Sequence, residues 1–258
     1  MMAKNWAIAA GDGARTRLRT LGTGMMKGRL IVFEGGEGGG KTTQIARSRQ
    51  WLQDSGWLAC LQANGFIQDV IVTREPGGTE LGRTIRQLLL NHTESEPMGD
   101  RTELLLYAAD RAQHVTHYLR PQLAAGMLIL CDRFTDSTVA YQGYGRGLDR
   151  ALIQQLNTIA TQGLESDLTL WLDLDPAIGL ARTQQRGQHD RMERSEFAFH
   201  ERVRQGFAQL AHAHRDRIVA IAADQPEADV SQQIQTVLDQ ALRRWFSISP
   251  DTAKRDEP

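Results

Sequence analysis

Residues 31–43 read IVFEGGEGGGKTT, a short apolar run followed by the pattern G-x-x-x-x-G-K-T. The apolar run predicts a buried strand, and the glycines allow the next loop to turn its backbone N–H groups inward around phosphate oxygens. The helix that follows adds unpaired amides and the positive end of its dipole. Lys41 would bridge the β- and γ-phosphates, and the Thr42 hydroxyl would ligate Mg²⁺. The pattern therefore predicts a nucleoside triphosphate site formed by Gly35, Gly36, Glu37, Gly38, Gly39, Gly40, Lys41, Thr42 and Thr43.

The composition is that of an ordinary globular domain. The 258 residues are 41% hydrophobic and 24% charged, with a net charge of −1. This balance gives no basic surplus for general nucleic-acid binding, and the chain has no apolar run of 18 or more residues that would predict a transmembrane helix. Cys60 and Cys131 make neither a disulfide framework nor a metal motif. We therefore expect a cytoplasmic protein with neither a nucleic-acid nor a membrane partner.

The two ends of the chain fit poorly with the rest. The one apolar run of residues 1–27, at positions 6–10, is too short for the hydrophobic region of a signal peptide. Met25-Met26 directly precede the first predicted strand, so a disordered extension or a wrongly assigned start is favoured over a targeting peptide. The tail at 246–258 is expected to fray. A single domain is expected at 28–245.

Between the ends, apolar runs alternate with helix-compatible segments. The predicted strands are Leu30–Glu34, Asp69–Thr73, Met127–Asp132, Leu168–Asp173 and Arg217–Ala222. The principal predicted helices are Thr42–Asp54, Glu80–Asn91, Arg101–Ala125 and Arg150–Thr161. Strands rich in Ile, Val and Leu that alternate with helices indicate an α/β fold, with a parallel sheet covered on both faces.

Polar clusters follow the first three of these strands. The first strand ends in the phosphate loop, the second in the sequence TREPGG at 73–78, and the third at Asp132-Arg133. Ligands gather at the carboxyl ends of parallel strands, so we expect these clusters on one edge of the sheet. Asp132 could hold Mg²⁺ opposite Thr42, and the planar fork of Arg133 suits phosphate oxygens. A structural ion pair is the alternative for the Asp-Arg pair.

Three further side chains are candidates for a second substrate. Arg74 precedes a rigid Pro-Gly-Gly turn, and a second phosphate group is its natural target. Tyr107 and Arg111 stand four residues apart and share one helix face, where they could stack on a base and hydrogen-bond to it. Core packing with a surface arginine is the alternative for this pair.

The arginine-rich segment at 182–204 has two interpretations. A charge-rich run is usually a solvated helix face. The sequence RGQHDR at 186–191, however, has the glycine and polarity of a loop that could close as a lid and bring arginines onto a phosphoryl group. The seven histidines form no convincing metal site.

Five segments together resemble the motifs of one known family, and they occur in the same order and with the same spacing as in that family. That family is the bacterial thymidylate kinases, and the similarity runs from about Lys27 to Leu242. The segments are FEGGEGGGKTT at 33–43, TREPGGT at 73–79, LLLYAADR at 104–111, DRF at 132–134 and STVAYQGYGRG at 137–147.

The resemblance implies a P-loop nucleoside monophosphate kinase fold with a five-stranded parallel sheet, helices on both faces and a lid at about 182–195. It also implies transfer of the γ-phosphoryl group of ATP to dTMP with Mg²⁺, giving dTDP for dTTP synthesis, by a homodimer. Arg74 and Arg133 would bind the acceptor phosphate, Arg111 the thymine edge, and Tyr107 would stack on the base where the family usually has Phe. The remaining roles fall to Glu37 at the 3′-hydroxyl, and to Ser137, Thr138, Tyr141 and Gln142 around base and sugar, with Tyr141 crowding the place of a 2′-hydroxyl.

The same resemblance assigns the catalytic groups. The family places its catalytic arginine either in the phosphate loop or in the lid, and the loop here contains none. Arg191, in the lid sequence DRME at 190–193, is the preferred candidate, with Arg186 second. The expected catalytic set is therefore Lys41, Asp132, Arg133 and Arg191, with Thr42 and Asp132 as metal ligands.

Two alternatives remain open. One is a kinase for another nucleoside monophosphate, such as dUMP, dCMP or AMP. The other is a P-loop ATPase or switch without a phosphoryl acceptor. A GTPase switch would need an Asn-Lys-x-Asp motif, which the sequence lacks, and a plain ATPase would not explain the cluster around Arg74.

Overall fold

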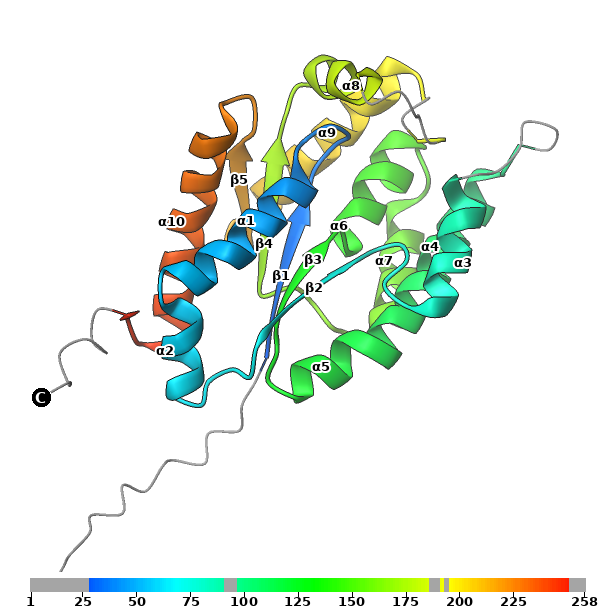
Figure 1. Cartoon of the computed structure of the whole chain (residues 1–258). Helices are drawn as coiled ribbons and strands as arrows, with labels where there is room; N and C mark the ends of the chain where they lie inside the picture. The colour runs from blue at the N-terminus through cyan, green and yellow to red at the C-terminus, as the bar shows by residue number, and fades with distance from the viewer. Residues whose placement is uncertain (1–27, 91–96, 186–190, 193–194, 251–258) are drawn as a thin grey trace, which may run out of the picture.

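The computed structural model describes residues 28–90, 97–185, 191–192 and 195–250. Its strands form one parallel sheet in the order β2-β3-β1-β4-β5 (Figure 1). They are β1 (Arg29–Glu34), β2 (Val70–Arg74), β3 (Leu128–Asp132), β4 (Leu168–Asp173) and β5 (Ile218–Ala222). The predicted five-stranded α/β fold is confirmed, and no strand boundary differs from its prediction by more than one residue.

Helices connect the strands and cover both faces of the sheet. They are α1 (Lys41–Asp54), α2 (Trp57–Ala63), α3 (Glu80–Leu90), α4 (Asp100–His114), α5 (Arg120–Ala124), α6 (Thr135–Thr138), α7 (Arg150–Thr161), α8 (Pro176–Gln184), α9 (Phe197–Ala213) and α10 (Glu227–Phe246), with π-helical turns η1 (Val115–Leu119) and η2 (Val139–Gly145). In the part of the chain that the structure describes, no helix is long and apolar enough to cross a membrane.

The predicted helix at 101–125 is observed as three consecutive helical segments, with a π-helical turn in the middle. The π-helical turn η1 separates α4 from α5. Pro121 lies at the start of α5 and has no N–H to donate to the carbonyl one turn earlier. The wider turn accommodates this missing bond, as π-bulges do inside longer helices.

Alternate strand residues point to two separate apolar layers. On one face, Ile31, Phe33 and their neighbours pack against α1, α2 and α10. On the other face, Leu30 and Val32 pack with η1, while Trp171 and Ile218 pack with α9 and η2. Because both faces are buried, the central strands read as continuous apolar runs.

The expected boundaries of the ends and the lid need adjustment. Helix α10 ends at Phe246, and both Phe246 and Ile248 pack against the core, so packed structure continues beyond the predicted boundary at 246. The predicted extension at 1–27 and the last residues, 251–258, lie outside the described residues. Of the predicted lid, 186–190 and 193–194 also lie outside them.

Candidate active site

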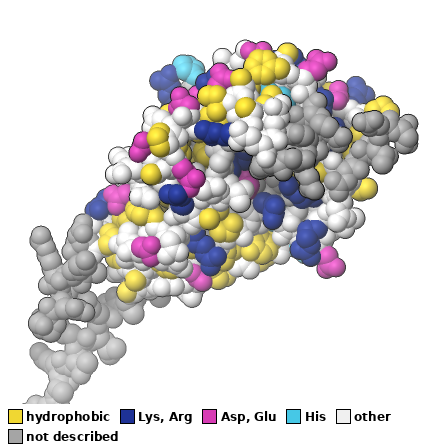
Figure 2. All heavy atoms as spheres, turned by 45° about the horizontal axis from the view of Figure 1, so that its top comes forward, with side chains coloured by type: hydrophobic (Ala, Val, Ile, Leu, Met, Phe, Trp, Pro, Cys, Tyr) yellow, Lys and Arg dark blue, Asp and Glu magenta, His cyan; other side chains and the backbone are white. Residues whose placement is uncertain are grey.

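The three polar clusters lie at one edge of the sheet. In the strand register, Asp132 stands opposite Phe33 of β1 on one side and opposite Arg74 of β2 on the other. Figure 2 looks onto this edge, where the strands of Figure 1 end, and Lys and Arg side chains are spread across it. The edge therefore brings the phosphate loop together with arginine side chains, as the order of motifs predicts.

The phosphate loop is folded tightly against its own lysine. Lys41 begins α1, and its Nζ donates to the carbonyl oxygens of Gly35 at 3.0 Å and Gly36 at 2.8 Å. Burial, followed by the nearby Arg133 charge, lowers the pKa of Lys41. Gly38 has a φ of +67°, and a Cβ there would lie 2.2 Å from the backbone oxygen of Gly179, so only glycine fits.

Arg133 joins the loop to the rest of the site. Its backbone has a φ of 70°, and its N–H donates to the Phe33 carbonyl at 2.9 Å. The guanidinium donates to Gly35 O at 3.0 Å and to Glu37 at 2.8 Å, and it lies 4.9 Å from the centre of the Tyr141 ring. An arginine held at both ends in this way presents a fixed cation beside the loop.

Glu37 and Glu34, three residues apart, have opposite electrostatic settings. Burial by itself raises the pKa of Glu37, but the charges of Arg133 and Lys41 and the Tyr141 hydroxyl lower it to about 2. Tyr141 Oη donates to Glu37 Oε1 at 2.7 Å. Burial, followed by the neighbouring Asp136 charge, raises the pKa of Glu34 to about 7. Glu37 is thus an anion at neutral pH, whereas Glu34 gains or loses its proton near neutral pH.

Glu34 supports the turn that carries Arg133, a role that the sequence motif did not indicate. Its side chain is fully buried and accepts the backbone N–H groups of Phe134 at 2.8 Å and Ser137 at 3.1 Å. The Ser137 hydroxyl adds a third bond at 2.5 Å. These bonds tie the end of β1 to the first turn of α6, directly after Arg133.

Two cavities meet at this edge. The loop cavity is lined by Glu37, Gly38, Gly39, Gly40, Lys41, Thr42, Thr43, Arg74, Glu75, Arg86, Asp132, Arg133 and Arg182. The inner cavity is lined by Glu37, Glu75, Pro76, Arg86, Leu90, Tyr107, Arg111, Arg133, Ser137, Thr138, Tyr141, Gln142 and Met192. They share Glu37, Glu75, Arg86 and Arg133, so one wall of side chains separates the two spaces.

Asp132 and Thr42 face the loop cavity together. Asp132 Oδ1 is buried and accepts no hydrogen bond from any residue that the structure describes. No group of three or more His, Cys, Asp or Glu side chains within the described ranges could enclose a metal ion. Mg²⁺ usually binds one or two protein oxygens and completes its shell with phosphates and waters. The Asp132–Thr42 pair fits such a partly protein-bound ion.

Arg111 is almost wholly committed to protein partners. It is 2% exposed, and its Nε donates to Glu75 at 2.8 Å. Nη1 donates to Thr138 and Asn157, and Nη2 to the Phe134 carbonyl. These described bonds use four of the five guanidinium N–H groups, so one Nη2 N–H remains for a ligand in the inner cavity.

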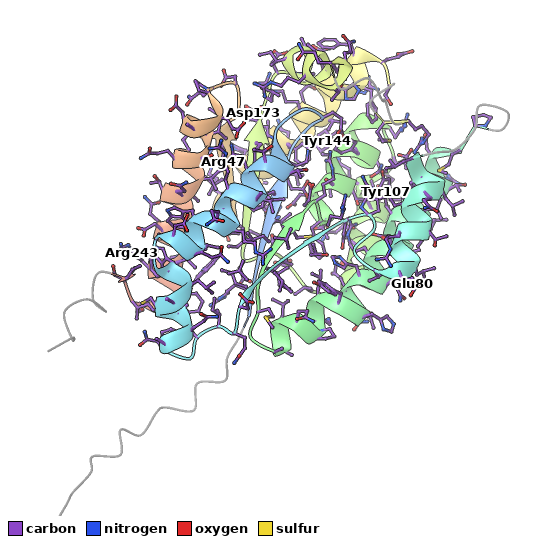
Figure 3. The ribbon with its side chains drawn as sticks, in the orientation of Figure 1. Arg47, Glu80, Tyr107, Tyr144, Asp173 and Arg243 are labelled. Atoms are coloured by element: carbon purple, nitrogen blue, oxygen red, sulfur yellow. The ribbon has the colours of Figure 1, made fainter. Side chains whose placement is uncertain are left out.

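All nine predicted substrate residues line these cavities, including Tyr107, which comes from α4 (Figure 3). Sequence reasoning missed Arg86, which borders both cavities and donates to the Pro76 carbonyl at 3.0 Å. Burial, followed by the Arg74 charge, lowers the pKa of Arg86. Nothing in the sequence of α3 distinguishes Arg86 from an ordinary surface arginine.

The lid arginines are placed differently from one another. Arg191 Nε donates to the Leu89 carbonyl at 2.9 Å, and its Nη2 pairs with Glu103. Arg182 borders the loop cavity, and its Nη1 lies 3.4 Å from the Gly38 carbonyl oxygen. Arg186 lies outside the described residues.

The fold and the site define a class, the P-loop nucleoside monophosphate kinases, in which a phosphate loop adjoins a second nucleotide pocket. The sequence model of the thymidylate kinase family matches residues 33–234. The chain therefore belongs to the thymidylate kinase family.

Individual relatives agree with this assignment. The chain is 63% identical over 228 residues to a thymidylate kinase of Cyanothece sp. (strain PCC 7425), which covers 86% of this chain and 97% of the relative. It is 57% identical over 232 residues to that of Acaryochloris marina, with 86% and 100% covered. The crystal structure of thymidylate kinase from Ehrlichia chaffeensis superimposes with a TM-score of 0.64 at 32% identity, covering 82% of this chain and 99% of that one.

Proposed function

We propose that the protein transfers the γ-phosphoryl group of ATP to dTMP, giving ADP and dTDP for dTTP synthesis. One observation carries this proposal: the loop cavity and the inner cavity share the wall that contains Glu37, Arg86 and Arg133. A donor phosphate on the loop and an acceptor nucleotide in the inner cavity would meet at these arginines. Names of the relatives supply the acceptor, dTMP, and the ATP-dependent reaction class.

On the donor side, the loop amides and Lys41 would hold the triphosphate. Thr42 and Asp132 would hold Mg²⁺, which neutralises phosphate charge when it is bound. Lys41 Nζ donates to the carbonyl oxygens of Gly35 at 3.0 Å and Gly36 at 2.8 Å, so its ammonium group lies within the loop that would bind the phosphates. Catalysis of phosphoryl transfer consists mainly of such positioning and charge stabilisation.

On the acceptor side, three arginines surround the expected position of the acceptor phosphate. Arg74 stands opposite Asp132 in the pairing of β2 with β3. Arg86 and Arg133 lie in the wall that the two cavities share. Tyr107 would stack on the base, Arg111 would donate its remaining N–H to it, and Glu37 would accept from the 3′-hydroxyl. Ser137, Thr138, Tyr141 and Gln142 complete the pocket.

We further propose that an arginine of the lid stabilises the transferring phosphoryl group. Arg191 is the preferred candidate and Arg186 the second, because no arginine lies in the phosphate loop. Arg191 would have to exchange its contact with Glu103 for one with the phosphoryl group. Its substitution therefore distinguishes a catalytic role from a role in the acceptor pocket.

A homodimer in the cytoplasm is the proposed state. Large apolar side chains are exposed on α3, α4 and α7, which pack side by side: Leu81 (51%), Leu88 (52%), Leu105 (56%), Leu152 (40%) and Ile159 (72%). A second copy of this chain would cover such a surface. Light scattering on the purified protein tests this directly, and a monomer at micromolar concentration would refute it.

A coupled assay of ADP release tests the proposed reaction. The purified chain, ATP and Mg²⁺ are combined with dTMP, dUMP, dCMP or AMP, each in turn. We expect the highest kcat/KM with dTMP and negligible release without an acceptor. A higher kcat/KM for another monophosphate would reassign the acceptor, and ADP release that needs no acceptor would identify an ATPase instead.

A further inference from the structure

Glu103 is a fully buried carboxylate behind the inner cavity. Its Oε1 accepts a hydrogen bond from Gln142 Nε2 at 2.8 Å. Its Oε2 accepts from Arg146 Nη2 at 3.3 Å and from Arg191 Nη2. A carboxylate accepts hydrogen bonds and donates none, and donors occupy both of its oxygens here. Every partner of Glu103 must therefore turn a donor toward it.

This requirement fixes the side-chain amide of Gln142. An amide has one donor end and one acceptor end, and Glu103 takes the donor end. Gln142 is 2% exposed and lines the inner cavity. The carbonyl Oε1 is consequently the end of the amide that is left for a ligand in the cavity.

We infer that Glu103 is a positioning residue that sets the base specificity of the pocket by holding the Gln142 amide with its oxygen toward the base. The inference rests on the proposed acceptor. Gln142 Oε1 accepts from an N–H at ring position 3, and the spare N–H of Arg111 donates to a carbonyl beside it. Thymine and uracil offer this pattern. Cytosine offers the reverse, because its N3 accepts and its exocyclic amine donates.

The two arginines make the effect of a substitution predictable. In Glu103→Gln, the new amide must turn its oxygen toward Arg146 and Arg191, because guanidinium groups cannot accept. Its NH₂ then faces Gln142, whose amide must rotate to offer its oxygen. Gln142 would present NH₂ to the cavity, and the pocket would favour an accepting ring nitrogen such as N3 of cytosine.

The test compares kcat/KM for dTMP, dUMP and dCMP in the wild type and in Glu103→Gln. We expect the dTMP/dCMP ratio to fall roughly 10-fold to 100-fold through loss of dTMP turnover, because a mismatched buried polar group is strongly disfavoured, whereas the unchanged Arg111 donor continues to disfavour the cytosine amine. The dTMP/dUMP ratio should stay constant, since both bases share the same edge. Asp100→Asn is the matched control: Asp100 lies 3.6 Å from Arg146 but its described ion pair does not involve Gln142, so the ratios should not change.

Two results overturn the inference: an unchanged dTMP/dCMP ratio in Glu103→Gln, or equal losses for all three substrates, which is the mark of a merely structural residue. If Glu103→Gln does not fold, Gln142→Leu decides. This variant should lower the ratio of kcat/KM for dTMP to that for dCMP through loss of dTMP turnover. An unaltered ratio would contradict the inference. A wild type without dTMP turnover would instead refute the proposed function.

Discussion

The loop cavity and the inner cavity are built by different means. Seven of the thirteen residues that line the loop cavity come from the continuous segment 37–43, and the other six come from other parts of the chain. The inner cavity is lined by residues of α3, α4, α6 and η2 and of the loops beside them, which are brought together only by the fold. A local motif therefore supplies the phosphate loop of the donor side, whereas the acceptor side depends on long-range hydrogen bonds. Substitutions should separate the two: donor-side changes lower kcat, and acceptor-side changes alter selectivity.

The largest effect is expected at the donor side, from Lys41→Met. The lysine stabilises developing charge and contributes little to packing, so transfer should fall about 10²–10³-fold, or ~3–4 kcal/mol, with the fold intact. Steady-state kinetics measures the loss, and circular dichroism serves as the folding control. Retention of more than half of the turnover would remove the loop from the mechanism.

The variant Arg191→Ala tests whether the lid arginine acts on the donor side, at the transferring phosphoryl group, or on the acceptor side. We expect kcat to fall about 10²-fold with little change in KM for dTMP, the pattern of an interaction made mainly in the transition state. Arg191→Lys should restore only part of the loss, because lysine has no bidentate fork. A raised KM with an unchanged kcat would instead place Arg191 on the acceptor side through Glu103.

Tyr141→Ala should loosen the acceptor side without removing activity. The ring lies under the Arg133 guanidinium and its hydroxyl donates to Glu37, which places it beside the expected sugar position. Discrimination against a 2′-hydroxyl should fall roughly 10–200-fold, by analogy with the rejection of one small group. The measure is kcat/KM for dTMP over ribothymidine monophosphate. A ratio that does not move would show that another residue reads the sugar.

The smallest effect is expected on the pH dependence of stability, through Glu34, which supports the turn that carries Arg133. Its pKa of about 7 in the folded state exceeds the unfolded value of 4.5, so the folded protein binds more protons between these pH values. Stability from this group is present at low pH and is lost as the pH rises toward and through 7, by up to about 1.4 kcal/mol per pH unit.

Glu34→Gln imitates the protonated carboxyl and should flatten this slope. Its amide oxygen can accept from Phe134 and Ser137, while its NH₂ donates to the Ser137 hydroxyl. Denaturant unfolding at pH 5, 6, 7 and 8 compares the variant with the wild type. We expect similar stability at pH 5 and a variant that is more stable at pH 8. Parallel pH profiles would contradict the shifted pKa.

Sequence patterns were sufficient where function is local. The strand ranges and the gathering of polar clusters at one edge followed from apolar runs and turn motifs, and the positions of Lys41 and Asp132 followed with them. The π-helical turn before Pro121 was not predicted, although the proline itself is visible in the sequence. Glu34, Arg86 and Glu103 could not be predicted, because their roles depend on partners that lie in other elements. Glu103, for example, meets Gln142 across 39 positions of the chain.

Transfer of the label from ATP labelled in its γ-phosphoryl group tests the central claim, that one shared wall joins a donor and an acceptor nucleotide. The purified wild-type chain is mixed with labelled ATP, Mg²⁺ and dTMP for a single turnover, and the products are separated. The account predicts one labelled dTDP for each ADP formed, and no label released without dTMP. Label recovered as inorganic phosphate, at a rate independent of dTMP, would contradict it.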